Sequence, residues 1–240
     1  MIARLLFLLL LLASPWAHAA ETCPVPENLA LRDMPLPAVK RAVAAGGGLT
    51  VLVMGGAAMA GKAAGDTALT LPARLEAALG AALPGVAVRV VDGSVPRATA
   101  ESGVQTMARV LGEIRPSLVI WAAGAREAVL GLDVEPYVAA LQQGIQAVQK
   151  AGADLILLDM QYAPSITRIA NLAPFRAALA GTAASHDVPL LERYELMMRW
   201  NDDGLLNLDA RDSEERRMVA RKLFGCLAQA LAAPIAAAAR

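Results

Sequence analysis

Five short apolar runs, separated by stretches with helical periodicity, constrain the fold of this chain more than any other feature. Strands that are apolar throughout and alternate with helices are typical of a parallel sheet covered on both faces. The sequence therefore predicts an α/β chain: a three-layer α/β/α sandwich with a flavodoxin-like, five-stranded parallel sheet. The expected strands are Leu49–Met54, Val86–Val91, Leu118–Ala122, Leu155–Leu158 and Pro189–Glu192.

Helices are expected between these strands and after the last one. They are predicted at residues 71–83, 100–114, 136–150, 174–185 and 213–232. In a parallel sheet of this kind, ligands bind beyond the carboxyl ends of the strands. The loops after Met54, Val91, Ala122 and Leu158, together with the turn into the last helix, are therefore the expected site region.

The first residues have the pattern of a secretory signal peptide. Arg4 supplies a positive charge, the run Leu5–Leu12 is apolar, and Ala17-His18-Ala19 is a small-x-small cleavage site. We expect a signal peptide over residues 1–19, an N-terminal arm over residues 20–47 and one domain over residues 48–240. No other segment is expected to be long and apolar enough to cross a bilayer. The mature protein is then expected to be periplasmic or secreted.

The chain has two cysteines, Cys23 and Cys226, near opposite ends of the expected mature protein. In an oxidising compartment such an even pair indicates a disulfide, the alternative being two unpaired thiols. A closed loop of about 200 residues would stabilise the fold by roughly 5 kcal/mol on the chain-entropy account. The predicted bond would tie the N-terminal arm to the last helix.

Composition excludes several classes of function. The 22 basic and 22 acidic residues balance, and no basic run or basic-aromatic patch indicates nucleic-acid binding. Aromatic residues make up only 4%, so no stacking platform for carbohydrate is evident. A zinc site needs a cluster of Cys, His or carboxylate ligands, and His186 is the sole histidine after the expected signal peptide. We therefore expect no metal and no cofactor.

The stretch Gly56–Lys62 has the Gly-x-x-x-x-Gly-Lys spacing of a phosphate-binding loop. Such a loop needs a Ser or Thr next, whose hydroxyl holds magnesium, and a helix that starts at once. Here Ala63 follows, and Ala64-Gly65-Asp66 continues as a loop. Asp159 ends a strand where a magnesium-assisting acid would lie, but this is common in α/β folds. A glycine-rich turn of another α/β domain is the better interpretation.

Three stretches resemble the SGNH (GDSL-type) hydrolase family. Residues 116–124, Pro-Ser-Leu-Val-Ile-Trp-Ala-Ala-Gly, resemble the block in which a strand runs into Gly-x-Asn. Asp159–Pro164 is similar to a strand end of an exported bacterial branch of the family, and Leu223–Leu231 is similar to the closing helix. The resemblance covers the chain from about Leu49 onward. It implies the SGNH hydrolase fold and, for the family, ester hydrolysis by a serine.

The resemblance also implies where the catalytic groups should lie, and this chain carries other residues there. Ala57 stands at the position of the nucleophile and has no hydroxyl, while Arg126 replaces the asparagine that would hold the oxyanion. Gly93 fits the glycine whose N–H would help to hold it. Counting back without gaps from the closing helix places Glu215 and Met218 at the Asp-x-x-His motif.

Other residues do not restore the missing groups. Glu215 also belongs to Asp212–Glu215, an Asp-x-x-Glu capping box at a helix start. His186 precedes the fifth strand, which places it at the opposite end of the sheet from the expected site. Ser94 follows Gly93 near that site, but no partner base is evident.

We therefore expect a catalytically inactive, exported relative of the family that acts as a binding or scaffold protein of the cell envelope. The expected partner is an envelope polysaccharide, an acylated small molecule or an active envelope enzyme. The alternative is an active ester or carbohydrate-ester hydrolase with a non-standard site, because fold alone does not establish function. Candidate ligand-binding residues are Gly56, Gly93, Ser94, Arg126 and Asp159.

Overall fold

A computed structural model describes residues 23–61 and 64–240. The predicted signal peptide, and Lys62 and Ala63 of the glycine-rich loop, lie outside these residues. The sheet has five parallel strands in the order β2-β1-β3-β4-β5, which confirms the predicted flavodoxin-like arrangement. The strands are β1 (Leu49–Met54), β2 (Val88–Asp92), β3 (Leu118–Ala122), β4 (Asp154–Leu158) and β5 (Leu190–Leu191).

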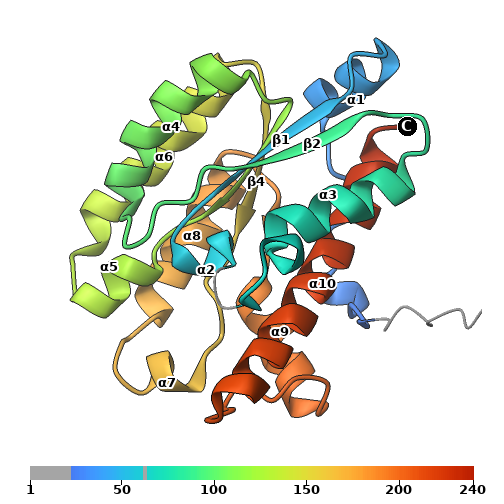
Figure 1. The fold of residues 1–240 in the computed structure, drawn as a ribbon. Helices are drawn as coiled ribbons and strands as arrows, with labels where there is room; N and C mark the ends of the chain where they lie inside the picture. The colour runs from blue at the N-terminus through green and yellow to red at the C-terminus, as the bar shows by residue number, and fades with distance from the viewer. Residues whose placement is uncertain (1–22, 62–63) are drawn as a thin grey trace, which may run out of the picture.

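Alternate strand residues point into two separate hydrophobic cores, one on each face of the sheet. Val51 and Val53 of β1 belong to one core, while Leu52 and Met54 belong to the other. This period of two explains why the strands are apolar throughout, since both faces are covered. Helices lie on both sides of the sheet, as Figure 1 shows, and the predicted three-layer sandwich is confirmed.

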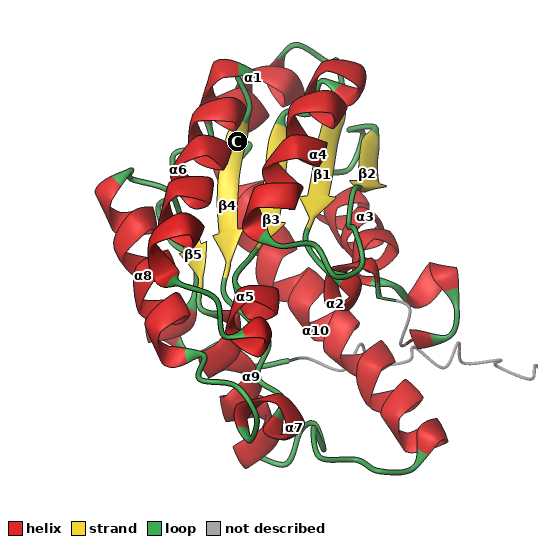
Figure 2. Ribbon diagram, turned by 90° about the vertical axis from the view of Figure 1, so that its left-hand side faces the viewer, coloured by secondary structure: helices red, strands yellow, loops and turns green. Residues whose placement is uncertain are grey.

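The helices divide between the two faces. Four helices share a core on one face: α1 (Pro37–Ala44), α3 (Leu71–Ala82), α9 (Arg193–Asp202) and α10 (Ser213–Ala238). Three cover the other face: α4 (Ala100–Ile114), α6 (Val134–Lys150) and α8 (Ala173–Ser185). Short helices α2 (Ala57–Ala60), α5 (Ala125–Leu130) and α7 (Pro164–Thr167) follow β1, β3 and β4, beyond the arrowheads in Figure 2. Single 3-10 turns occur at Glu27–Leu29 and Thr67–Leu69.

The last helix corrects two expectations from the sequence. We expected it to end at Ala232, and we expected no segment beyond the signal peptide to suit a membrane span. Instead α10 continues through Pro234 to Ala238, and by length and composition it is apolar enough to cross a membrane. Half of its most apolar window is buried inside the protein, and it packs along α3. Its place in the core accounts for its apolar composition.

The described part of the N-terminal arm is fastened to the domain at three points. The predicted disulfide is present between Cys23 and Cys226, with Cα atoms 5.2 Å apart. The Trp200 indole N–H donates to the carbonyl of Pro24 at 2.7 Å. Val39 N–H, in the first turn of α1, donates to the Asp154 carboxylate at 2.8 Å, which supplies the cap that α1 lacks locally.

Candidate functional site

A cavity of about 210 Å³ opens at the carboxyl ends of β1, β3 and β4. It therefore lies where the strand order reverses, between β1 and β3, as expected for a sheet of this topology. Five segments line it: Gly56–Met59, Arg97–Ala98, Ala122–Arg126 with Val129, Met160–Gln161, and Arg193. Most of this lining is apolar, and its charged side chains are all arginines.

The turn after β1 places Ala57 at the mouth of the cavity. Gly55 has φ +152°, and a Cβ there would come within 2.6 Å of the Met59 side chain. This close approach makes glycine necessary, because it lets the chain turn sharply from β1 into α2. Ala57 is then the first residue of α2 and lines the cavity. The position that the resemblance assigns to a nucleophile therefore faces the cavity with a methyl group.

The turn after β3 leads into α5, in which the neighbours Arg126 and Glu127 have different surroundings. Gly124 has φ +97°, and a Cβ there would lie 2.7 Å from the Tyr137 hydroxyl, so only glycine fits. Arg126 lines the cavity, whereas the Glu127 carboxylate is buried and accepts a hydrogen bond from the N–H of Ala100 at the start of α4. Burial, together with the nearby Glu127 charge, raises the pKa of Tyr137. Glu127 thus caps a helix and does not face the cavity.

The loop after β2 differs from the sequence expectation. Gly93 N–H donates to the carbonyl of Val53 at 2.8 Å, so it continues the sheet and is not free to hold an oxyanion. Gly93 lines a smaller neighbouring cavity, and Ser94 lies beside it with a buried hydroxyl that has no partner. The residues of this loop that line the main cavity are Ala98 and Arg97, the latter at φ +65° in the left-handed region.

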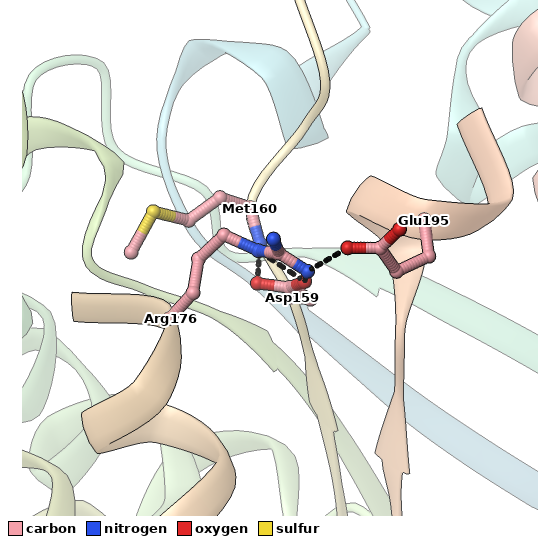
Figure 3. Close-up of polar contacts among 4 residues, drawn as sticks. All are labelled: Asp159, Met160, Arg176 and Glu195. Atoms are coloured by element: carbon pink, nitrogen blue, oxygen red, sulfur yellow. Dashed lines mark hydrogen bonds and ion pairs between the residues drawn. The ribbon is translucent and has the colours of Figure 1, made fainter. Parts of the chain in front are cut away.

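Asp159, at the end of β4, is engaged in an ion network and does not line the cavity. Its carboxylate accepts hydrogen bonds from Met160 N–H at 2.7 Å and from Arg176 Nε at 2.9 Å. The Arg176 guanidinium also contacts Glu195 at 2.8 Å, so it bridges the two carboxylates (Figure 3). Burial opposes the charge on Arg176, but hydrogen bonds and charges from Asp159 and Glu195 outweigh it and raise its pKa. The network holds β4, α8 and α9 together.

Arg193, like Arg97, lines the cavity and was not expected from the sequence. It begins α9 directly after β5, is 4% exposed, and has the thioether of Met59 as the acceptor for Nη1 at 3.1 Å. Its Nε is buried without a partner. Burial lowers the pKa of Arg193 to about 10, although the charge of Asp159 acts in the opposite direction. The sequence did offer one signal for Arg193: a charged residue directly after the fifth expected strand, at the edge of the sheet where ligands are expected to bind.

The remaining predicted residues lie outside this cavity. Glu215 and Met218 are on α10, where Glu215 accepts a hydrogen bond from Asn207 at 2.7 Å and Met218 is 55% exposed. Asp212 caps α10 by accepting from the backbone N–H groups of Glu215 and Glu214, and these hydrogen bonds lower its pKa. His186 ends α8, before β5, with its Nδ1 within 3.0 Å of the Thr182 carbonyl. Among the residues described, no cluster of three or more His, Cys, Asp or Glu side chains could hold a metal.

The five-stranded parallel sheet with helices on both sides matches solved structures of SGNH (GDSL-type) hydrolases. The crystal structure of AlinE4, an SGNH-hydrolase family esterase, matches with a TM-score of 0.55 at 22% identity, over 69% of this chain and 86% of its own. The lipase/acylhydrolase from Enterococcus faecalis matches with a TM-score of 0.53 at 19% identity, over 73% and 93%. A two-domain esterase active on acetylated mannans, CEX, matches with a TM-score of 0.64 at 14% identity, over 84% and 56%. At these identities the likeness establishes the fold.

The family assignment comes from the sequence as a whole. The model of the non-GDSL lipase-like family matches residues 22–240, and the chain belongs to that family. A search of the curated proteins finds no matching relative. The fold and the family are therefore established, while the chemistry of the cavity has to be argued from its own residues.

Proposed function

We propose that this protein is an exported, catalytically silent member of the non-GDSL lipase-like family that binds a ligand in the cavity over β1 and β3. The observation that carries this proposal is the chemistry of the cavity wall. Among its described residues there is no Ser, Thr, Cys or His and no carboxylate. Ester hydrolysis of the SGNH type needs a nucleophile and a base within hydrogen-bond reach of each other. Ala57 offers neither.

The disulfide between Cys23 and Cys226 supports the exported part of the proposal, because such bonds persist in oxidising compartments. Cell fractionation with a C-terminal tag tests it. We expect the tagged protein in the periplasm or the medium, shortened by the signal peptide. Full-length protein confined to the cytoplasm would contradict export.

A non-standard hydrolase is the second candidate, and Ser94 is the observation that favours it. Its hydroxyl is buried without a partner, and its chain neighbours Gly93 and Val95 line a small cavity. No described histidine serves it, since His186 lies at the end of α8 that precedes β5. The test offers short-chain nitrophenyl esters and acetylated sugars to the mature protein and to Ser94→Ala. We expect no turnover above buffer; turnover that Ser94→Ala abolishes would overturn the proposal.

The ligand class within the envelope is part of the same proposal. An acylated small molecule suits a cavity whose wall combines apolar side chains with guanidinium groups. An envelope polysaccharide and an active envelope enzyme are the other partners considered. Thermal-shift screening against each class separates them, since a ligand of the folded state raises the melting temperature by mass action.

A further inference from the structure

Arg193 has donors that the protein does not satisfy. Its side chain is buried, its Nε has no partner, and the acceptor of Nη1 is a thioether, which is weak. A buried guanidinium in a folded protein is normally paired with a carboxylate or another strong acceptor, because an unpaired buried charge is costly. The side chain also forms part of the cavity wall. The guanidinium group therefore borders space that a ligand can fill, and the Nε that lacks a partner is covered by the surrounding protein.

The carboxylate whose charge acts on Arg193 does not supply the missing partner. Asp159 is close enough to influence the pKa of Arg193, but its oxygens are engaged by Arg176 and by the backbone of Met160. Asp159, Arg176 and Glu195 together carry one net negative charge. That charge partly balances Arg193 at a distance and leaves its hydrogen-bonding capacity unused.

Two further arginines make the cavity attractive to an anion. Arg126, half-buried in the first turn of α5, and Arg97, exposed in the loop after β2, line the same cavity. Apart from Gln161, the rest of the wall comes from small or apolar side chains such as Met59, Val129 and Met160. The site therefore combines a buried cationic anchor with an apolar surround.

We propose that the cavity binds a small organic carboxylate with an apolar tail, whose carboxylate is held by Arg193. The proposal rests on the proposed function, in which the cavity binds and does not hydrolyse. A guanidinium presents its N–H donors in a planar fork that matches the two oxygens of a carboxylate. The tail would lie against the apolar wall, while Arg126 and Arg97 add long-range attraction for the negative head.

Calorimetry with acetate, butyrate and hexanoate tests the proposal on the disulfide-bonded mature protein. Hexanamide and hexylamine serve as uncharged and cationic probes of similar shape. We expect binding of the carboxylates only, with affinity that rises about fourfold for each methylene that enters the apolar wall. Absence of hexanoate binding, or equal binding of hexanamide, would contradict the proposal that Arg193 binds the carboxylate.

The variant Arg193→Met tests the role of Arg193 in carboxylate binding separately from any role in folding. Methionine keeps an unbranched apolar side chain of comparable reach, so we expect the variant to fold while hexanoate affinity falls by about 10- to 100-fold. Arg199→Met, on an exposed part of the same helix, is the matched control and should bind like the wild type. Arg193→Lys keeps the charge without the fork and should give an intermediate loss. Unchanged hexanoate binding in either Arg193 variant would overturn the proposal.

The same preparations distinguish this inference from the proposed function. Ester turnover by the wild type would remove the proposed function, whatever the carboxylates do. An inert protein that binds an envelope ligand but not hexanoate would keep the proposed function and overturn the anchor.

Discussion

Two arginines near Asp159 have opposite environments. Arg176 reaches two carboxylates and stacks over the Tyr194 ring, with its guanidinium carbon 3.9 Å from the ring centroid. Arg193 is more deeply buried and has a thioether and an orphaned Nε. The pKa of the first is raised and that of the second is lowered, to about 10.

The difference shows how one residue type serves structure in one place and binding in another. The groups around Arg176 are complete, so its network stabilises the junction of β4, α8 and α9. Arg193 lacks strong hydrogen-bond acceptors among the described residues. Buried donors without acceptors, and charged groups with shifted pKa values, are found where a ligand binds. The predictions below test this contrast, from the largest expected effect to the smallest.

Arg176→Met should destabilise the protein most. Asp159, whose side chain is 4% exposed, would lose its ion-pair partner, and breaking such a pair costs about 3 kcal/mol. Urea unfolding followed by circular dichroism measures the change. Arg109→Met is the control, since its pair with Glu113 is exposed and should contribute no more than about 0.5 kcal/mol. Equal effects of the two substitutions would show that the network around Asp159 is not structural.

Asp159→Asn should act in opposite directions on stability and on binding. Loss of the charged hydrogen bonds to Arg176 should destabilise the protein by about 2 kcal/mol. Removal of the negative charge near Arg193 should strengthen hexanoate binding by about threefold. Unfolding and calorimetry on the same sample measure both quantities. Weaker hexanoate binding by this variant would contradict the placement of Arg193 as the anchor.

Arg193→Met should leave stability equal or raise it by about 1 kcal/mol at neutral pH, because it removes a buried charge without a strong partner. The sign follows from linkage. Burial lowers the pKa of Arg193 to about 10 in the folded state. Below that pH the buried charge reduces the free energy of unfolding of the wild type. The reduction disappears as the pH rises above about 10 and the folded protein releases this proton. The advantage of the variant should therefore shrink in alkali. A marked loss of stability at neutral pH would show that Arg193 is a structural residue.

Arg126→Gln should have a small effect that is confined to binding. Arg126 lines the cavity and has no ion-pair partner among the described residues. We expect hexanoate affinity to fall by about threefold, as for a partly solvated charge, and the free energy of unfolding to stay unchanged. A loss as large as that of Arg193→Met would make Arg126 the anchor instead.

The smallest effect should be that of pH between 7 and 9. Between pH 7 and pH 9, hexanoate affinity of the wild type should change by less than about twofold, because Arg193 keeps its proton. Above the pKa of about 10 the affinity should fall steeply, with Asp159 the nearby charge that delays the loss. A fall centred near neutral pH would point to another titrating group.

Patterns along the chain predicted the layers, the order of the sheet and the edge at which the cavity lies. The reason is local: apolar runs such as Leu49–Met54 form strands in any context that covers both faces. Helix α9 was missed, although Arg193, Leu196, Met197 and Trp200 form a buried face at helical spacing. Its polar composition hid that face.

Details of the site depended on tertiary contacts that the sequence does not display. Gly93 matched an oxyanion glycine by position, but its N–H continues the sheet to Val53. Glu215 and Met218 were assigned by a gapless count back from Cys226, and that count places both residues within α10, away from the cavity. Arg97 lines the cavity from a left-handed backbone conformation, which its residue type does not indicate.

The most direct test observes the orphaned donor itself. Arginine Nε–H signals in a ¹⁵N–¹H spectrum report hydrogen bonding at that nitrogen, and Arg193→Met identifies the signal of Arg193. We predict that hexanoate shifts this signal to the position of a charge-assisted hydrogen bond, while hexanamide leaves it in place. A signal that hexanoate does not move, in a sample where calorimetry shows hexanoate bound, would contradict the central claim that Arg193 holds the anion.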